Sequence, residues 1–195
     1  MHKNRLEAFS DGVLAIILTI MVLELKVPRH DASLAALREL VPVFLSYVLS
    51  FVYVGIYWNN HHHLMQAAHK VNGAVLWANL HLLFWLSLLP FTTGWLGENG
   101  IRPWPVFAYN LDLLLAGVAY FILARTLVAH HGPESALAQA MGARASGDVK
   151  GLVSVVIYAV ALPLSFAAPL VGVLLPVAVA LMWIVPDRRI ERHVA

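Results

Sequence analysis

Six long apolar stretches limit what this chain can fold into. An α-helix rises about 1.5 Å per residue and the hydrocarbon core of a bilayer is about 30 Å thick, so about 20 apolar residues can cross it. The chain is 60% hydrophobic and only 12% charged over 195 residues, well above the apolar share of soluble domains. The sequence therefore predicts an all-α integral membrane protein, one domain over residues 1–195. Its six transmembrane helices are expected at roughly 7–27, 40–62, 73–96, 104–128, 150–169 and 171–186.

The distribution of lysine and arginine predicts the orientation of these spans. Six spans place nine of the 13 basic residues on the side of the termini and four on the other side. Loops rich in lysine and arginine stay in the cytoplasm, so both termini are predicted to be cytoplasmic. The connection from about His130 to Lys150 is expected to be a mobile or short-helical cytoplasmic loop. The two sets are Lys3, Arg5, Lys70, Arg125, Arg144, Lys150, Arg188, Arg189 and Arg192, against Lys26, Arg29, Arg38 and Arg102.

Composition also excludes several classes of function. The chain has no cysteine, which excludes disulfides, thiolate metal sites and thiol catalysis. Its formal net charge is +2, without basic clusters beyond the tail, so no nucleic-acid partner is predicted. No Ser/His/Asp set, paired carboxylates or phosphate-binding glycine loop is present at compatible depth, and we expect no enzyme activity. The first apolar stretch ends in charged residues without a small-x-small cleavage site, so we expect it to be retained.

The first apolar stretch is uncharged from Gly12 to Leu23 and has a distinct face. Rings of branched apolar side chains around a shared axis form a dry constriction that gates by dewetting, and Thr19 alone would offer oxygen there. The pattern by itself is also compatible with packing against lipid or other helices, as most apolar stripes do. At about 100° per residue, the side chains within roughly 60° of Ile16 are those of Phe9, Gly12, Thr19, Ile20 and Leu23.

Asp11 lies outside this face. It points about 140° away from Ile16 and about 120° away from Arg5, so any partner of its carboxylate must come from another helix. Charged groups at the edge of the hydrocarbon are costly unless paired, which favours a cross-helix network. The alternative is an ordinary helix start, in which Ser10 or Asp11 caps backbone amides and Arg5 contacts lipid phosphate.

The order Arg5-x-x-x-Phe9-Ser10-Asp11, followed by an apolar helix ending in Leu-Glu-Leu-Lys-Val-Pro, closely resembles the signature of the transmembrane protein 175 family. Trp58-Asn-Asn-His61 and Leu88-Leu-Pro90-Phe91 extend the similarity along the first three helices, and beyond about residue 100 only the hydropathy matches. Members of this family are potassium-permeable channels of endolysosomal membranes and of prokaryotes. A chain with one six-helix repeat looks like the prokaryotic kind, which assembles as a tetramer.

This resemblance implies a function and a set of site residues. The chain would be a homotetrameric, moderately selective potassium channel of a prokaryotic plasma membrane, passing potassium down its gradient without a cofactor. The resemblance places the constriction at Ile16 and the selectivity hydroxyl at Thr19, with Ile20 and Leu23 continuing the lining of helix 1. It also implies that the motif residues Arg5, Phe9, Ser10 and Asp11 brace this helix, with His61 meeting Arg5 and Asp11.

The polar residues of the later spans support an alternative function. Asp112 lies inside an apolar window and is either a buried interhelical partner or an interfacial group. A relay through Asp112 and membrane-facing histidines would make the chain a proton- or cation-coupled transporter. Consecutive helical positions point about 100° apart, so the run His61 to His63 cannot converge on one ion, and no metal site is predicted. His62, His63 and His81 have no assigned role.

Overall fold

The computed structural model describes residues 3–28, 33–132, 135, 138 and 149–184, and within these ranges every regular element is a helix. All-α architecture is therefore confirmed. Five stretches are long and apolar enough to cross a membrane, with α4 and α5 counted together as Gly73–Asn99, whereas α9 is a shorter apolar helix. The elements are α1 (Asn4–Leu23), α2 (Leu34–Glu39), α3 (Val41–Ala67), α4 (Gly73–Leu86), α5 (Leu89–Asn99), α6 (Pro103–His131), α8 (Val149–Ala167) and α9 (Pro169–Ile184).

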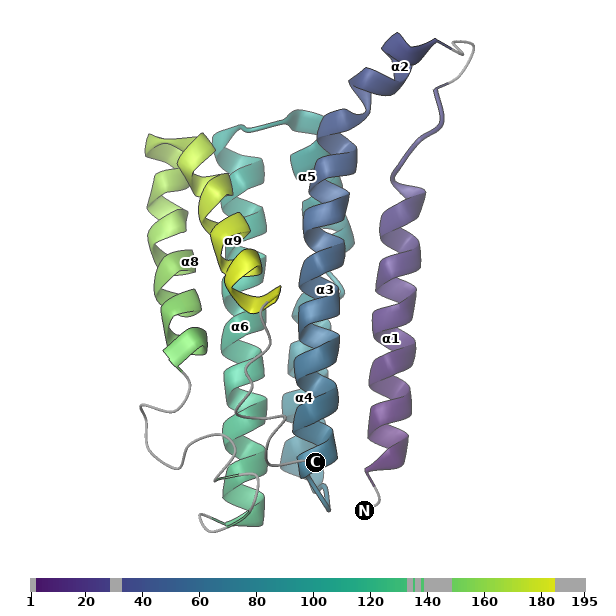
Figure 1. Cartoon of the computed structure of the whole chain (residues 1–195). Helices are drawn as coiled ribbons and strands as arrows, with labels where there is room; N and C mark the ends of the chain where they lie inside the picture. Colours follow the sequence, from purple (N-terminus) through teal and green to yellow (C-terminus); the bar gives the residue numbers. More distant parts are fainter. Residues whose placement is uncertain (1–2, 29–32, 133–134, 136–137, 139–148, 185–195) are drawn as a thin grey trace.

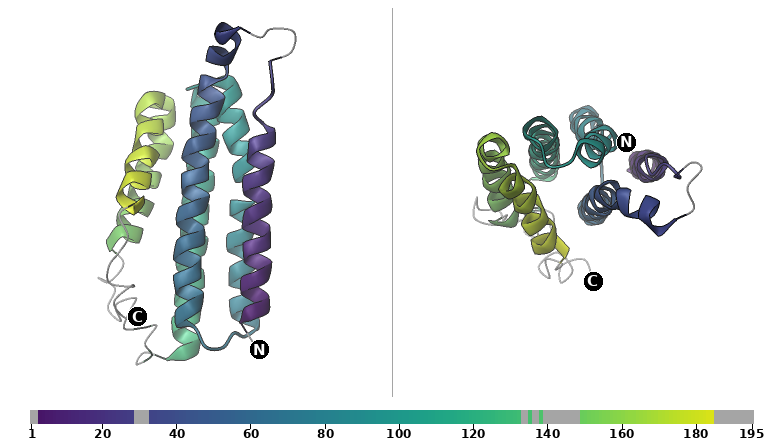
Figure 2. Two further views of the ribbon diagram at one scale, coloured as in Figure 1. Left: turned by 45° about the vertical axis from the view of Figure 1, so that its right-hand side comes forward. Right: turned by 90° about the horizontal axis from the view of Figure 1, so that it is seen from above.

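The long helices stand side by side and alternate in direction (Figure 1). The hairpin of α8 and α9 packs against α6, while α1 lies at the opposite edge of the bundle beside α3, α4 and α5 (Figure 2). The first residues of α1 and the last residues of α9 point toward the same end. Most of the predicted loop from His130 to Lys150 lies outside the described residues.

The predicted third span is broken in its middle. α4 ends at Leu86, and α5 begins at Leu89 with Pro90 in its first turn. Proline has no backbone N–H and its ring clashes with the carbonyl four residues earlier, so one continuous helix is disfavoured there. α5 approaches α3 closely at Gly97, where an added Cβ would lie 2.6 Å from Ser46 Oγ.

Buried hydroxyl groups tie the helices together in the core. The hydroxyl of Tyr53 donates to the carbonyl of Pro176 on α9 at 2.6 Å, and the hydroxyl of Tyr158 donates to Tyr53 at 3.0 Å. Nearer α5, Ser50 Oγ and Thr93 Oγ1 are 2.6 Å apart. Because lipid offers no hydrogen-bond partners, such groups must pair between helices, and these pairs fix α3 against α5, α8 and α9.

The exposed face of helix α1 and the network behind it

One face of α1 packs against its own protomer. Its buried residues recur every three or four positions, which is the spacing of one helical face, and they lie against α3, α4 and α5. This buried face consists of Leu6, Ser10, Leu14, Ile17 and Met21.

The opposite face is the predicted stripe, and it is uncovered. The exposed fractions of Ile16, Ile20 and Leu23 are 59%, 42% and 76%, and Phe9 is 52% exposed. Thr19 is exposed as well, and its hydroxyl donates to the carbonyl of Ile16 at 2.8 Å. Since that hydrogen bond uses the only hydrogen of the hydroxyl, the remaining lone pairs of Thr19 Oγ1 are acceptors. The stripe therefore combines branched apolar side chains with one hydroxyl oxygen that can accept a hydrogen bond or contact a cation.

A buried polar chain lies directly behind this stripe. Asn79 Nδ2 donates to Ser10 Oγ at 2.9 Å, and Asn79 Oδ1 lies 2.7 Å from His61 Nε2. Ser10 and Asn79 are fully buried and His61 is 2% exposed. Because the amide oxygen can only accept, His61 Nε2 carries the hydrogen. The Ser10–Asn79–His61 chain thus joins α1, α4 and α3 at one depth.

The motif residues are arranged differently from the expected network. His61 reaches Ser10 through Asn79, not Arg5 or Asp11, and Asp11 accepts a hydrogen bond from Trp58 Nε1 at 3.0 Å. Arg5 is exposed, and among the described residues nothing forms a hydrogen bond or ion pair with it. The bracing role of Arg5 and Phe9 remains a prediction.

Sequence reasoning missed Asn79 as a member of this chain. The available signal was an amide side chain in the middle of an apolar stretch, since such residues in membrane helices usually bond across helices. Trp58 was noted only as part of the family pattern, and its indole N–H now has a definite partner in Asp11.

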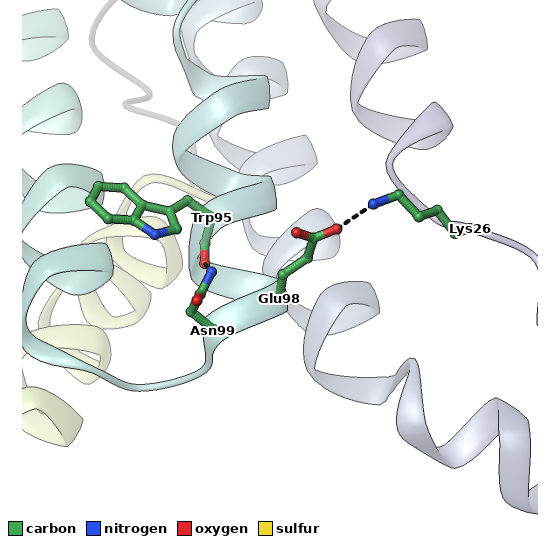
Figure 3. A network of polar contacts seen from close by, with 4 residues as sticks. All are labelled: Lys26, Trp95, Glu98 and Asn99. Atoms are coloured by element: carbon green, nitrogen blue, oxygen red, sulfur yellow. Dashed lines mark hydrogen bonds and ion pairs between the residues drawn. The ribbon is translucent and has the colours of Figure 1, made fainter.

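Residues at both ends of α1 also contact other helices through polar groups. At the start of the helix, Lys3 Nζ donates to the carbonyls of Met65 and Gln66 at 2.8 and 3.2 Å, near the carboxyl end of α3, where a cation is favoured. Beyond the other end, Lys26 Nζ lies 2.5 Å from Glu98 Oε1 on α5 (Figure 3). The hydrogen bond and the charge of Glu98 raise the pKa of Lys26.

Comparison with known proteins agrees with the motif. The model of the endosomal/lysosomal potassium channel TMEM175 family matches residues 5–90. A protein named as a potassium channel in Chryseobacterium sp. (strain P1-3) is 50% identical over 192 residues, which cover 98% of this chain and 97% of that protein. This chain belongs to the TMEM175 family. The similarity thus runs almost the full length, well past the first three helices on which the resemblance was based.

Other TMEM175 relatives differ in how much of their length is similar to this chain. A solved structure of a TMEM175 homolog from Chamaesiphon minutus, titled a lysosomal potassium-selective channel, has a TM-score of 0.77 at 26% identity and covers 99% of this chain and 98% of that chain. The human protein, named an endosomal/lysosomal proton channel, is 39% identical over 101 residues, which are 46% of this chain and 20% of that protein. The fold is therefore shared with the homolog over nearly the whole chain, whereas the similarity to the human protein covers less than half of it.

Asp112 is placed by this TMEM175 fold inside the bundle. α6 begins at Pro103, so Asp112 lies about 13 Å along the helix at 1.5 Å per residue. Its side chain is 4% exposed, and Thr92 on α5 donates to Oδ2 at 3.0 Å. Of the two readings left open by the sequence, the structure selects the buried interhelical partner. The other carboxylate oxygen, Oδ1, has no hydrogen-bond partner among the described residues.

Proposed function

We propose that this chain is a potassium-permeable, moderately selective cation channel that moves potassium passively across the membrane. The observation that carries the proposal is the uncovered stripe of α1, in which Ile16, Thr19, Ile20 and Leu23 face away from their own protomer. The potassium-channel name of the near-full-length relative supports it. Ions descending their gradient need no cofactor.

The proposed pore is formed by several copies of α1 around one axis. A single protomer leaves α1 at the edge of its bundle (Figure 2). A closed lining therefore requires symmetry-related copies, and we propose a homotetramer. Each protomer contributes one six-helix domain over residues 1–195, with α9 as the sixth span. Both termini lie in the cytoplasm, and the membrane is the plasma membrane of a prokaryote.

The proposed gate and the proposed selectivity site lie at different positions of α1. Rings of Ile16, Ile20 and Leu23 are dry when narrow, and water and ions enter only when the ring widens. The acceptor oxygen of Thr19 replaces part of the hydration shell of a cation between these rings. The chain has no Thr-Val-Gly-Tyr-Gly filter, so discrimination between potassium and sodium is moderate.

The transporter alternative rests on Asp112 and has weaker support. The carboxylate of Asp112 accepts a hydrogen bond from the hydroxyl of Thr92. Two histidines of α3 and α4 have other partners: His61 of α3 bonds to Asn79, and His81 of α4 accepts from Trp85 at 3.0 Å. Nothing found among the described residues connects Asp112 to a histidine relay.

The test is current from purified protein in a planar bilayer under a potassium/sodium bi-ionic gradient. Ile16→Asn wets the constriction and raises the current, and Thr19→Val mainly lowers the preference for potassium. Val22→Asn is the matched control, because Val22 is an apolar residue of α1 that is 43% exposed but lies outside the stripe. Unitary current steps exclude a transporter. Conductance and selectivity that stay unchanged in both stripe variants remove α1 from the pore.

A further inference from the structure

The end of α6 holds the connection between α3 and α4 through two histidine rings. His131 Nε2 accepts hydrogen bonds from the backbone N–H groups of His69 at 3.0 Å and Lys70 at 3.3 Å. One residue earlier, His130 Nδ1 lies 3.1 Å from the amide nitrogen of Asn72. Asn72 in turn caps α4, because its side-chain oxygen accepts from the N–H of Val75.

These contacts define the protonation state of His131. Its Nδ1 lies 2.9 Å from the carbonyl oxygen of Leu127, which can only accept, so Nδ1 carries the hydrogen. Its Nε2 faces two backbone donors and must therefore be unprotonated. His130 Nδ1 likewise faces the NH2 group of Asn72 and acts as the acceptor. Both rings bond to the connection only as neutral imidazoles.

Protonation reverses the role of each accepting nitrogen. A hydrogen on His131 Nε2 would face the N–H groups of His69 and Lys70, and a hydrogen on His130 Nδ1 would face the amide of Asn72. We propose that His130 and His131 form a pH-sensitive clamp on the α3–α4 connection, closed when the rings are neutral and released when they are protonated. The clamp lies at the end of the bundle where α1 begins.

No carboxylate among the described residues forms an ion pair with either ring of the clamp. The carboxyl end of α6 favours a cation there. Histidine is the side chain type that ordinarily changes charge between about pH 5 and 8. The titratable groups near these ends of the adjoining elements are Lys3 and Glu7 of α1, His62 and His63 of α3, His69 and Lys70 of the connection, and Arg125 of α6.

The clamp is connected to α1 through the same segment. Lys3 bonds to the carbonyls of Met65 and Gln66, only a few residues before the amides that His131 holds. Release of the connection therefore loosens the anchor of the first residues of α1. Through this link, acidification on that side of the membrane loosens the start of α1 in each protomer.

Nuclear magnetic resonance of the 15N-labelled full chain in lipid nanodiscs tests the clamp. At about pH 8 we expect the His131 ring as the Nδ1–H tautomer, and on titration to about pH 5 the amide resonances of His69 and Lys70 move with the midpoint of that ring. His131→Gln abolishes this movement. His69→Gln is the matched control, because it removes a nearby ring, keeps its own backbone N–H and leaves the movement intact.

Three results would overturn the proposal. They are an Nε2–H tautomer of His131 at about pH 8, protonation of the ring without movement of the two amides, and movement that persists in His131→Gln. The tautomer is measured on the unaltered chain, so the proposal stays testable if a variant fails to fold. No current is recorded, so the outcome is independent of whether the chain conducts ions.

Discussion

Removing the side chain of Asn79 tests whether the Ser10–Asn79–His61 chain fixes α1 to the bundle. Asn79 is fully buried, donates to Ser10 on α1 and accepts from His61 on α3. In Asn79→Ala, the Nε2–H of His61 loses its acceptor in an apolar environment. Ser10 is less affected, because its hydroxyl still donates to the carbonyl of Leu6 at 2.8 Å.

The expected loss in the free energy of unfolding follows from the hydrogen bonds that each substitution removes. A buried donor left without a partner costs about 1–3 kcal/mol, so Asn79→Ala should lower the free energy of unfolding by about that amount. Ser10→Ala breaks one interhelical hydrogen bond, and such bonds contribute about 0.6 kcal/mol on average and about 1.7 kcal/mol at most in membrane proteins. The coupling between Ser10 and Asn79 should lie between the same two values.

The measurement is a double-mutant cycle on reversible unfolding in mixed detergent micelles. The single variants Ser10→Ala and Asn79→Ala are compared with the double variant, and the departure from additivity gives the coupling free energy. Asn99→Ala is the control, because the Asn99 amide is exposed and donates only to Trp95 of its own helix, at 3.0 Å (Figure 3). Substitutions at such positions usually change stability by less than about 0.5 kcal/mol. If the two changes add to within about 0.3 kcal/mol, the bond does not couple α1 to α4.

Two further predictions concern the outer end of α1 and its neighbour α5. The pair of Lys26 and Glu98 contributes stability below the unfolded pKa of the lysine and loses it as the pH rises through the raised folded pKa, above about 10.5. The difference in Tm between the unaltered chain and Lys26→Met should therefore shrink at that pH, and a constant difference would rule out the ion pair as its cause. Gly97→Ala should lower the free energy of unfolding by about 1–3 kcal/mol, since its Cβ would overlap Ser46. Gly55→Ala, with nothing within 4 Å of the new Cβ, should be neutral or stabilising, and equal losses in both variants would refute the packing argument.

Hydropathy predicted the helices well and their ends less well. The second span was expected to end at residue 62, but α3 continues to Ala67, where Ala68 adopts an extended backbone. The extra turn mixes His63 and Gln66 with Leu64, Met65 and Ala67. Hydropathy reports how well a residue tolerates lipid and carries no information about whether the backbone hydrogen bonds continue. α2 was missed for a related reason. It is six residues long, capped by Ser33, and too short to give an apolar window.

The two faces of α1 could be predicted from the sequence, and the partners on other helices could not. Which α1 side chains share a face depends only on the rotation per residue, so the stripe around Ile16 follows from local geometry. Which residue meets His61 depends on how α3 and α4 are placed along each other. That register is set by packing over the whole bundle, so the amide of Asn79 indicated a bond across helices but not that His61 would be its partner.

The attachments of α1 constrain how the proposed pore can open. The helix is held at its start by Lys3, behind its first half by Ser10, and beyond its end by Lys26. Ser10 and Ile16 are six residues apart, about 9 Å along the axis, so the constriction is backed closely by a buried hydrogen bond. If α1 moves as a body when the proposed pore opens, at least one of these attachments must separate. The exposed Lys26–Glu98 pair, in contact with water, is the attachment that separates at the lowest cost.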